Sequence, residues 1–330
     1  MTINLLHNIA LIGLVSLVVF LNFGKIINII NLYDYPDNFR KIHKKKIALA
    51  GGGILLIYSF SYFILHFFFK NIQNDLLNIY FFIFLLLFFL IGFVNDKKNI
   101  IPILRLIFLS IILFILIQLD HDLKITKLYF QSFNKTLYLH NYSIFFTILC
   151  FLLFINALNM FDGINLQSIS FSFFFLVILF LKCNSLFLIY LLIPLFILAI
   201  FNYKNLTFLG DNGVYVLAFV IGYFVIKNYN KLDSISPEEI FILMSIPGLD
   251  MLRLFLIRII NKKNPFAPDR NHIHHLLLAK FGYIKTICFL FFLNSVPYLF
   301  YHFSKNFIII PFILFFYLTL IFNLRHFVKK

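Results

Sequence analysis

Residues 79–99 read IYFFIFLLLFFLIGFVNDKKN, an apolar run that stops abruptly at a cluster of amide, acidic and basic side chains. The apolar part is short for a hydrocarbon layer of ~30 Å, so we expect the helix to continue into the flanking residues. Within a membrane only helices and closed barrels satisfy every backbone N–H and C=O group. This stretch therefore predicts a transmembrane helix that carries polar residues at one end.

The same pattern recurs along the chain, in which 62% of the 330 residues are apolar and 12% are charged. So few charges cannot cover the surface of a soluble protein, which needs about a quarter. A disordered chain, a secreted disulfide scaffold and a nucleic-acid-binding domain are excluded as first interpretations. We predict one all-α polytopic membrane domain over residues 1–330, with about 10–11 transmembrane helices. The apolar segments are 3–23, 50–69, 79–94, 101–119, 142–159, 167–182, 184–201, 213–227, 239–260, 286–303 and 307–324.

Basic residues in the loops orient these segments. Of the 28 Lys and Arg residues, 20 fall in alternate loops and the C-terminus, and eight fall on the other side. Cytoplasmic loops carry the excess of basic residues, so we expect the richer side and the C-terminus in the cytoplasm and the N-terminus outside. The longest outer loop, 120–141, is too short to fold alone.

Acidic residues are few, and their positions are informative. On the basic side, Asp96, Asp162, Asp211 and Asp250 lie at or just inside the ends of apolar helices, where an unpaired carboxylate is costly. Helix capping explains any one of them, but four on one face favour a functional site. For Asp250 a structural pair with Arg253 or Arg258 is the competing interpretation. We expect ordinary solvated loop charges on the far side, at Asp75, Asp120, Asp122, Asp233, Glu238 and Glu239.

Five polar stretches surround these carboxylates, and all lie on the basic side. They read DYPDNFRKIHKKKIALAGGG (34–53), NDKKN (95–99), NALNMFDGINL (156–166), NLTFLGDNG (205–213) and NPFAPDRNHIHH (264–275). Carboxylates with amide oxygens suit a hard cation such as Mg²⁺, and Arg with His suits phosphate oxygens. The three glycines at 51–53 permit either backbone contact with a phosphate or tight helix packing. The composition of these loops predicts metal-assisted chemistry on a phosphate at the membrane surface.

These stretches, in this order, resemble the motifs of the polyprenyl-phosphate N-acetylhexosamine-1-phosphate transferases, which are glycosyltransferase family 4 enzymes. The resemblance implies that undecaprenyl phosphate attacks a UDP-N-acetylhexosamine, with Mg²⁺ or alternatively Mn²⁺ as cofactor and UMP as leaving group. It also implies a bacterial cytoplasmic (inner) membrane location among membrane lipids, the start of a lipid-linked envelope glycan, and no nucleic-acid partner. A homodimer is an open alternative to a monomer.

Site residues follow from the resemblance at matching positions. The expected catalytic residues are Asp96, Asp162, Asp211, His274 and His275, of which Asp211 and Asp96 would hold the metal. The expected substrate-binding residues are Lys41, His43, Asn156, Asn159, Phe208, Arg270 and His272, with Phe208 stacked on uracil. The chain departs from the family pattern where Asn95 and Asn165 replace aspartates, Ala48 replaces a proline, and Asn212 and Tyr215 replace small residues.

Two other functions fit part of the sequence. A transporter or flippase of lipid-linked sugars shares the polytopic scaffold, but it needs polar residues at the bilayer midplane and on both sides of its path. A catalytically impaired paralogue is favoured by Asn95, because an amide cannot act as a base and is a weaker magnesium ligand.

Overall fold

The computed structural model describes residues 2–36, 45–69, 76–232, 234–267 and 269–328, and within these ranges one long helix lies in each of the eleven predicted segments. The pair at 167–201, which only a short polar break divides, is two separate helices. The long helices are α1 (Thr2–Leu21), α3 (Gly51–Phe69), α4 (Ile79–Lys98), α5 (Pro102–Leu119), α6 (Ser143–Phe161), α7 (Gln167–Cys183), α8 (Leu186–Tyr203), α9 (Gly210–Lys227), α10 (Pro237–Ile260), α12 (Tyr283–Ser304) and α13 (Ile309–Val328).

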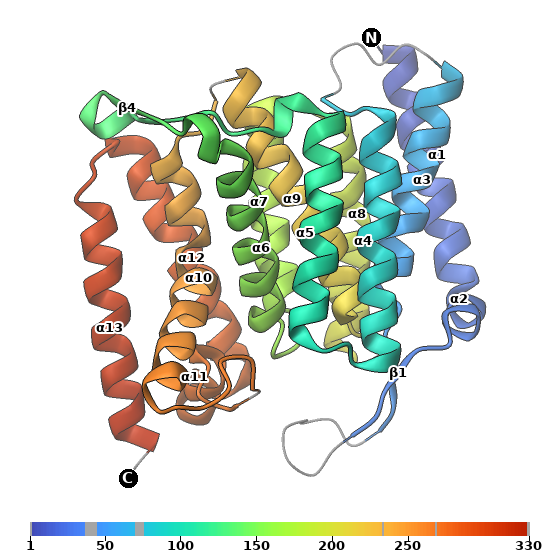
Figure 1. Ribbon diagram of the computed structural model, residues 1–330. Helices are drawn as coiled ribbons and strands as arrows, with labels where there is room; N and C mark the ends of the chain where they lie inside the picture. Colours follow the sequence, from blue (N-terminus) through green and yellow to red (C-terminus); the bar gives the residue numbers. More distant parts are fainter. Residues whose placement is uncertain (1, 37–44, 70–75, 233, 268, 329–330) are drawn as a thin grey trace.

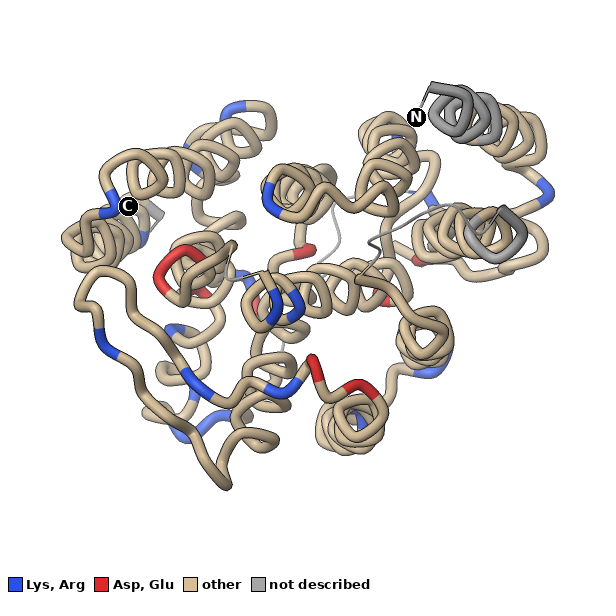
Figure 2. The backbone as a smooth tube through the Cα atoms, turned by 90° about the horizontal axis from the view of Figure 1, so that it is seen from above, with Lys and Arg blue, Asp and Glu red and all other residues tan. Residues whose placement is uncertain are grey.

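Their length and composition identify a multi-pass membrane protein. Among the described residues, eight helices are long and apolar enough to cross a membrane. Ile12–Leu21 of α1 and the following α2 (Phe23–Ile30) meet at an angle of 71°, and they add a ninth if the bent pair is one span. Two further apolar helices are shorter, at Gly51–Leu65 and Gln167–Cys183. The all-α class is confirmed, and seen from above most helices appear end-on with few charged residues along them (Figure 2).

Several short elements were not predicted. Helix α11 (Ile273–Phe281) lies in the loop between α10 and α12. Strands β1 (Tyr33–Asp34) and β2 (Ile47–Ala48) pair antiparallel, and β3 (Lys127–Phe130) with β4 (Lys135–Tyr138) forms a hairpin in the loop 120–141. Short 3₁₀ segments lie at His121–Leu123, Gln131–Phe133 and His140–Tyr142, and a π-helical turn at Asn228–Leu232.

The predicted polar stretches meet at one end of the bundle, which we call the motif end (the lower end in Figure 1). There α4, α6 and α10 end, α3 and α9 begin, and α11 and β1 lie beside them. The opposite end, the far end, carries the β3–β4 hairpin and the N-terminus, while the C-terminus lies at the motif end (Figure 1). The two termini thus lie at opposite ends of the bundle.

Helix α9 forms the centre of the bundle, since 89% of its span is buried inside the protein. Aromatic rings of α4 pack against it, with ring centroids 5.4 Å apart for Phe81 and Phe219 and 4.7 Å for Phe88 and Phe219. At the motif end, glycine lets α4 come closer still. A Cβ atom on Gly92 would lie 2.5 Å from the Cα of Asn212 and 2.6 Å from the carbonyl oxygen of Asp211. The start of α9 is therefore pressed against the last turns of α4.

The expectation of solvated acidic residues at the far end is wrong for Asp120, Glu238 and Glu239, which are all buried. Asp120 pairs with the buried Lys227 at 2.9 Å and also accepts hydrogen bonds from the Tyr223 hydroxyl and the Asn78 amide. Buried ion pairs persist only when their remaining polar atoms are also satisfied.

Two other basic residues, Lys182 and Lys305, lie 3.0 and 2.9 Å from the carboxylate of Glu239. These pairs join helices at the far end, which no local pattern reveals. Asp122 is partly exposed, as expected, whereas Asp75 and Asp233 lie outside the described residues.

The close approach of α4 to α9 leads to a stability prediction. Gly92→Ala should lower the free energy of unfolding by about 1–3 kcal/mol, because backbone atoms block the new methyl group. Gly248→Ala is the matched control, since no atom lies within 4 Å of the Cβ position there. Thermal unfolding in detergent measures both, and equal melting temperatures for the two variants would contradict the packing described for α4 and α9.

Candidate active site

The carboxylate of Asp96, on the last turn of α4, caps the start of α9. Its Oδ1 accepts a hydrogen bond from the backbone N–H of Asp211 at 2.9 Å, and its Oδ2 accepts one from that of Asn212 at 3.0 Å. The Asn212 side-chain amide donates a third, at 2.5 Å. The first N–H groups of a helix have no partner within the helix, so a carboxylate there stabilises it. Gly210, with φ +71°, allows the chain to turn into this contact.

Two amides hold the carboxylate of Asp211 in turn. The Asn159 amide of α6 donates to Oδ1 at 2.6 Å, and the Asn95 amide of α4 donates to Oδ2. The oxygen of Asn95 accepts from the backbone N–H of Ile100 at 2.9 Å, which fixes the side chain. Three helices therefore meet at Asp211, as the motif positions suggested.

The third carboxylate, Asp162, follows directly after the last residue of α6. Burial, together with the negative charge of Asp211, raises the pKa of the Asp162 carboxyl to about 7. Within the described part of the chain, no Lys, Arg or His forms an ion pair with Asp96, Asp162 or Asp211. Among the described residues, the cluster is therefore acidic, with no ion pair to a basic side chain. Asn156, the other predicted amide on α6, instead donates to the Leu152 carbonyl at 2.7 Å.

The structure decides between the two interpretations of the glycines at 51–53. The N–H of Gly51 donates to the Phe208 carbonyl at 3.3 Å, and that of Gly52 donates to the Asn212 side-chain oxygen at 2.7 Å. Neither N–H is available to a phosphate, so these two glycines serve the packing of α3 against α9. Phe208 is half-buried, and its own N–H donates to the Ala48 carbonyl at 2.8 Å, which joins the FLGD loop to β2.

The histidines approach from the other side, at the start of α11. His272 and His274 are buried, with ring planes 10° apart and centroids at 5.3 Å, and the half-buried His275 lies 4.3 Å from His274. A Cβ atom on Gly163 would lie 2.0 Å from Nε2 of His274, so this ring covers the end of α6 beside Asp162. Arg270 is exposed. Lys41 and His43 lie outside the described residues.

Comparison with known proteins points to the same region. The family model described as "Glycosyl transferase family 4" matches residues 78–229, from the start of α4 to the turn after α9. A protein of Pasteurella multocida is 30% identical over 268 residues, which cover 76% of this chain and 72% of that protein. The chain belongs to glycosyl transferase family 4.

Two other family 4 relatives are similar over the same length. A Salmonella typhi protein is 29% identical over 273 residues, covering 76% of this chain and 70% of that protein. A protein of Escherichia coli is 26% identical over 273 residues, covering 77% and 71%. These two and the Pasteurella multocida protein are named undecaprenyl-phosphate alpha-N-acetylglucosaminyl 1-phosphate transferase.

The departures of this family 4 chain from the expected pattern fall into two groups. Asn95 and Asn212 lie inside the acidic cluster, where their amides donate to Asp211 and Asp96. Asn165 points elsewhere, because its amide donates to the Asn202 carbonyl at 2.9 Å and to the Asn205 side chain at 2.7 Å. Replacement of a carboxylate at 165 therefore changes the link between α7 and α8, away from the carboxylates.

The donor set at the motif end fits a hard cation. Mg²⁺ is usually held through one or two carboxylates with water completing an octahedron. Here the carboxylates of Asp96 and Asp211 lie at the start of α9, and none of the ion pairs of the described residues involves either of them. The described residues contain no group of three or more His, Cys, Asp or Glu side chains placed to hold a metal together. Asp211 and Asp96 would hold such an ion together with water.

Sequence reasoning missed residues that reach the site by packing alone. Thr207 is buried and its hydroxyl donates to the Ala48 carbonyl at 2.9 Å, while Ala50 N–H donates back to it at 3.0 Å. Gln167 lies 3.4 Å from Nδ1 of His274. The sequence points to these residues only weakly: Gln167 is a polar residue next to the 156–166 stretch, and Thr207 lies within the 205–213 stretch.

Burial of His274 leads to a prediction on stability and pH. Burial lowers the pKa of His274 well below its usual 6.5, and the neighbouring His275 and His272 lower it further. As pH falls below about 6.5 the unfolded chain binds a proton at this position that the folded chain does not, so acid favours unfolding. Between pH 7.5 and 5.5 the melting temperature of the wild type should therefore fall more than that of His274→Gln. Parallel curves would contradict a neutral, buried His274.

Proposed function

We propose that this protein transfers an N-acetylhexosamine 1-phosphate from a UDP-sugar to undecaprenyl phosphate and releases UMP. One observation carries the proposal: Asp96, Asp162 and Asp211 lie at the motif end, and no Lys, Arg or His among the described residues forms an ion pair with them. A soluble dianionic donor and a lipid phosphate in the headgroup plane can both reach a site built on helix ends. The names of the relatives support this substrate class.

In the proposed reaction, a phosphate oxygen of the lipid attacks the β-phosphorus of the UDP-sugar. The bond from that phosphorus to the bridging oxygen breaks, and UMP leaves with the bond's electron pair. A phosphate dianion is already nucleophilic, so positioning and electrostatic stabilisation can supply most of the catalysis without a strong base. The product is a lipid diphosphate sugar, which starts a lipid-linked envelope glycan such as O-antigen or teichoic acid.

A bound Mg²⁺, or Mn²⁺ in its place, would supply positive charge to the diphosphate. In this proposal the carboxylates of Asp211 and Asp96 hold the ion, and the cap that Asp96 places on α9 aims Asp211 at it. The amide of Asn159 orients the Asp211 carboxylate. Asp162, with its pKa raised to about 7, can hold or release a proton near neutral pH beside the reacting phosphates.

The remaining site residues surround this centre. From α11 and its preceding loop, His272, His274, His275 and Arg270 would bind the diphosphate and the sugar. Phe208 would stack on the uracil ring, and Asn156 would line the nucleotide site. Lys41 and His43 would bind phosphate from the first basic loop.

The orientation in the membrane is part of the proposal. By the loop count, the side of the chain that holds the motifs has 20 of the 28 Lys and Arg residues, so the motif end would face the cytoplasm of a bacterium, with the N-terminus outside. This places the site on the side of the inner membrane where UDP-sugars are made. The C-terminus would then also be cytoplasmic.

The competing function is that of a catalytically impaired family member, and Asn95 is the observation that favours it. Where the family pattern has a carboxylate, the Asn95 amide donates to Asp211. This contact neutralises part of the charge that would otherwise attract the metal.

The function is tested with purified protein, undecaprenyl phosphate, Mg²⁺ and a panel of UDP-sugars, with UMP release as the measurement. We expect release with at least one UDP-N-acetylhexosamine.

Asp211→Asn should reduce the rate of UMP release by about 10²–10³-fold or more, because a metal-binding charge is lost. Asp122→Asn, the same substitution at the far end, is the control and should leave the rate unchanged. Release by Asp211→Asn at the wild-type rate would refute the metal assignment.

The role of Asn95 gives a second prediction. Asn95→Asp should make stability depend on magnesium, because two adjacent carboxylates repel each other unless a cation lies between them. We expect the melting temperature of this variant to fall in EDTA and to rise with Mg²⁺ by more than that of the wild type. An equal effect of Mg²⁺ on both proteins would place the ion away from residue 95.

A further inference from the structure

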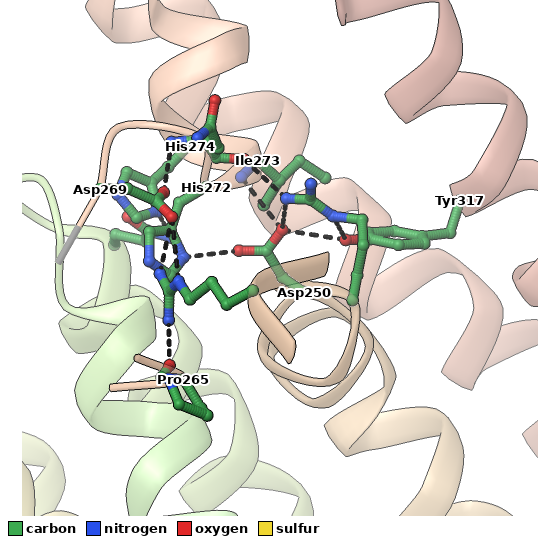
Figure 3. A network of polar contacts seen from close by, with 11 residues as sticks. Asp250, Pro265, Asp269, His272, Ile273, His274 and Tyr317 are labelled. Carbon is green, nitrogen blue, oxygen red and sulfur yellow. Dashed lines mark hydrogen bonds and ion pairs between the residues drawn. The ribbon is translucent and has the colours of Figure 1, made fainter. Parts of the chain in front are cut away.

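The carboxylate of Asp250 lies at the centre of a polar network around the histidine segment, residues 272–275 (Figure 3). It lies on α10, just inside the motif end, and only 3% of its surface is exposed. The proposed transfer does not use it directly. A carboxylate buried to this extent is stable only if each oxygen is satisfied, so its partners show what it holds in place.

Both oxygens of Asp250 are occupied. Oδ1 accepts hydrogen bonds from the Arg253 guanidinium at 2.7 Å, the Tyr317 hydroxyl at 2.9 Å and the backbone N–H of Ile273 at 3.1 Å. Oδ2 lies 2.9 Å from Nδ1 of His272. One side chain therefore joins α10 to α13 and to the start of α11.

The contact with His272 fixes the tautomer of its ring. A carboxylate oxygen only accepts, so Nδ1 of His272 carries the proton and Nε2 is left for another partner. The ring then stacks on His274, whose own ring covers the end of α6. Rotation of the His272 ring would break the bond to Asp250 and disturb the stack.

Asp250 also supplies the cap of α11. The residue at the N-cap position, His272, makes no capping hydrogen bond with its side chain, and the N–H of Ile273 bonds instead to Asp250. Arg253 strengthens the same joint, because it donates to the Asn271 carbonyl at 2.7 Å as well as to the Tyr317 hydroxyl at 2.9 Å. The segment that carries the histidines is thus bound to α10 at its backbone and at its first ring.

A separate ion pair holds the other end of the loop. Arg258 donates to the Asp269 carboxylate at 2.9 and 3.0 Å and to the Pro265 carbonyl at 2.7 Å. Of the two arginines predicted as partners of Asp250, Arg253 forms the pair, and Arg258 binds Asp269 instead. Asp250 touches a histidine, whereas the Arg258 pair secures the loop before the histidines.

We propose that Asp250 is a positioning residue of the transferase: it acts through His272 by fixing the ring and the start of α11, and Tyr317 of the last helix completes the arrangement. The effect on catalysis, which is the placement of His272 against the diphosphate, rests on the proposed function. The placement itself is a property of the protein without substrate.

The first test is a double-mutant cycle on UMP release. Asp250→Asn and His272→Gln should each lower kcat by about 10–100-fold, as loss of an orienting partner commonly does. The double variant should be no slower than His272→Gln, because Asp250 acts through that ring. Variants that only reduce the folded fraction would multiply their effects, and a multiplicative loss would overturn the inference.

A milder variant protects the test against misfolding. Tyr317→Phe removes one hydroxyl and keeps the ring, so α13 should stay packed while Asp250 and Arg253 each lose a partner. We expect a kcat reduced by a smaller factor than in Asp250→Asn, with an unchanged KM for the UDP-sugar. Asp122→Asn at the far end serves as the control. Full kcat in Tyr317→Phe would show that the last helix plays no part.

The second test needs no activity. In protein labelled with ¹⁵N-histidine, the His272 ring signal, identified by its absence in His272→Gln, should report a proton on Nδ1. In Asp250→Asn that signal should shift or broaden, and in Asp122→Asn it should not. An unchanged His272 signal in Asp250→Asn would refute the positioning role. Absence of UMP release by the wild type, with the expected signals present, would instead refute the proposed function alone.

Discussion

The cap that Asp96 places on α9 is the interaction on which the site depends. It links the end of one helix to the start of the most buried helix in the bundle, through two backbone N–H groups and one side-chain amide. Such a contact is possible only because Gly92 lets the two backbones approach closely. Once α9 is fixed in this way, Asp211 in its first turn can point only toward the ends of α4 and α6.

The histidine segment is held by the same physical device at a different place. Asp250 caps α11 much as Asp96 caps α9, and in both cases the carboxylate belongs to another helix. A cap donated across helices couples the position of one element to that of its neighbour. The two halves of the site, acidic and basic, are therefore each anchored to the membrane-spanning scaffold and meet where His274 covers Gly163.

Much of the fold could be predicted from the sequence. Each apolar segment contains one long helix. The short segments 79–94 and 213–227 extend into their polar flanks, as expected, so that α4 includes Asp96 and α9 includes Asp211. Asp96, Asn159 and Asp211 lie together at the motif end, whereas Asn156 and Asn165 bond elsewhere. What the sequence left open or got wrong shares a cause. The choice between the two roles of the glycines at 51 and 52, the burial of Asp120 and the short helix α11 all depend on contacts with distant residues, which hydropathy does not report.

Sequence alone determined where the helices lie, how many apolar segments there are and which end gathers the basic residues and the motifs. Hydropathy and charge are local properties, because each segment must by itself be apolar enough to lie in the hydrocarbon core of the membrane. Only the tertiary structure decided which polar side chains satisfy one another: Asn95 with Asp211, 116 residues apart, and Asp250 with Tyr317, 67 residues apart. A buried polar atom takes whichever partner the packing brings to it, and packing is a property of the whole bundle.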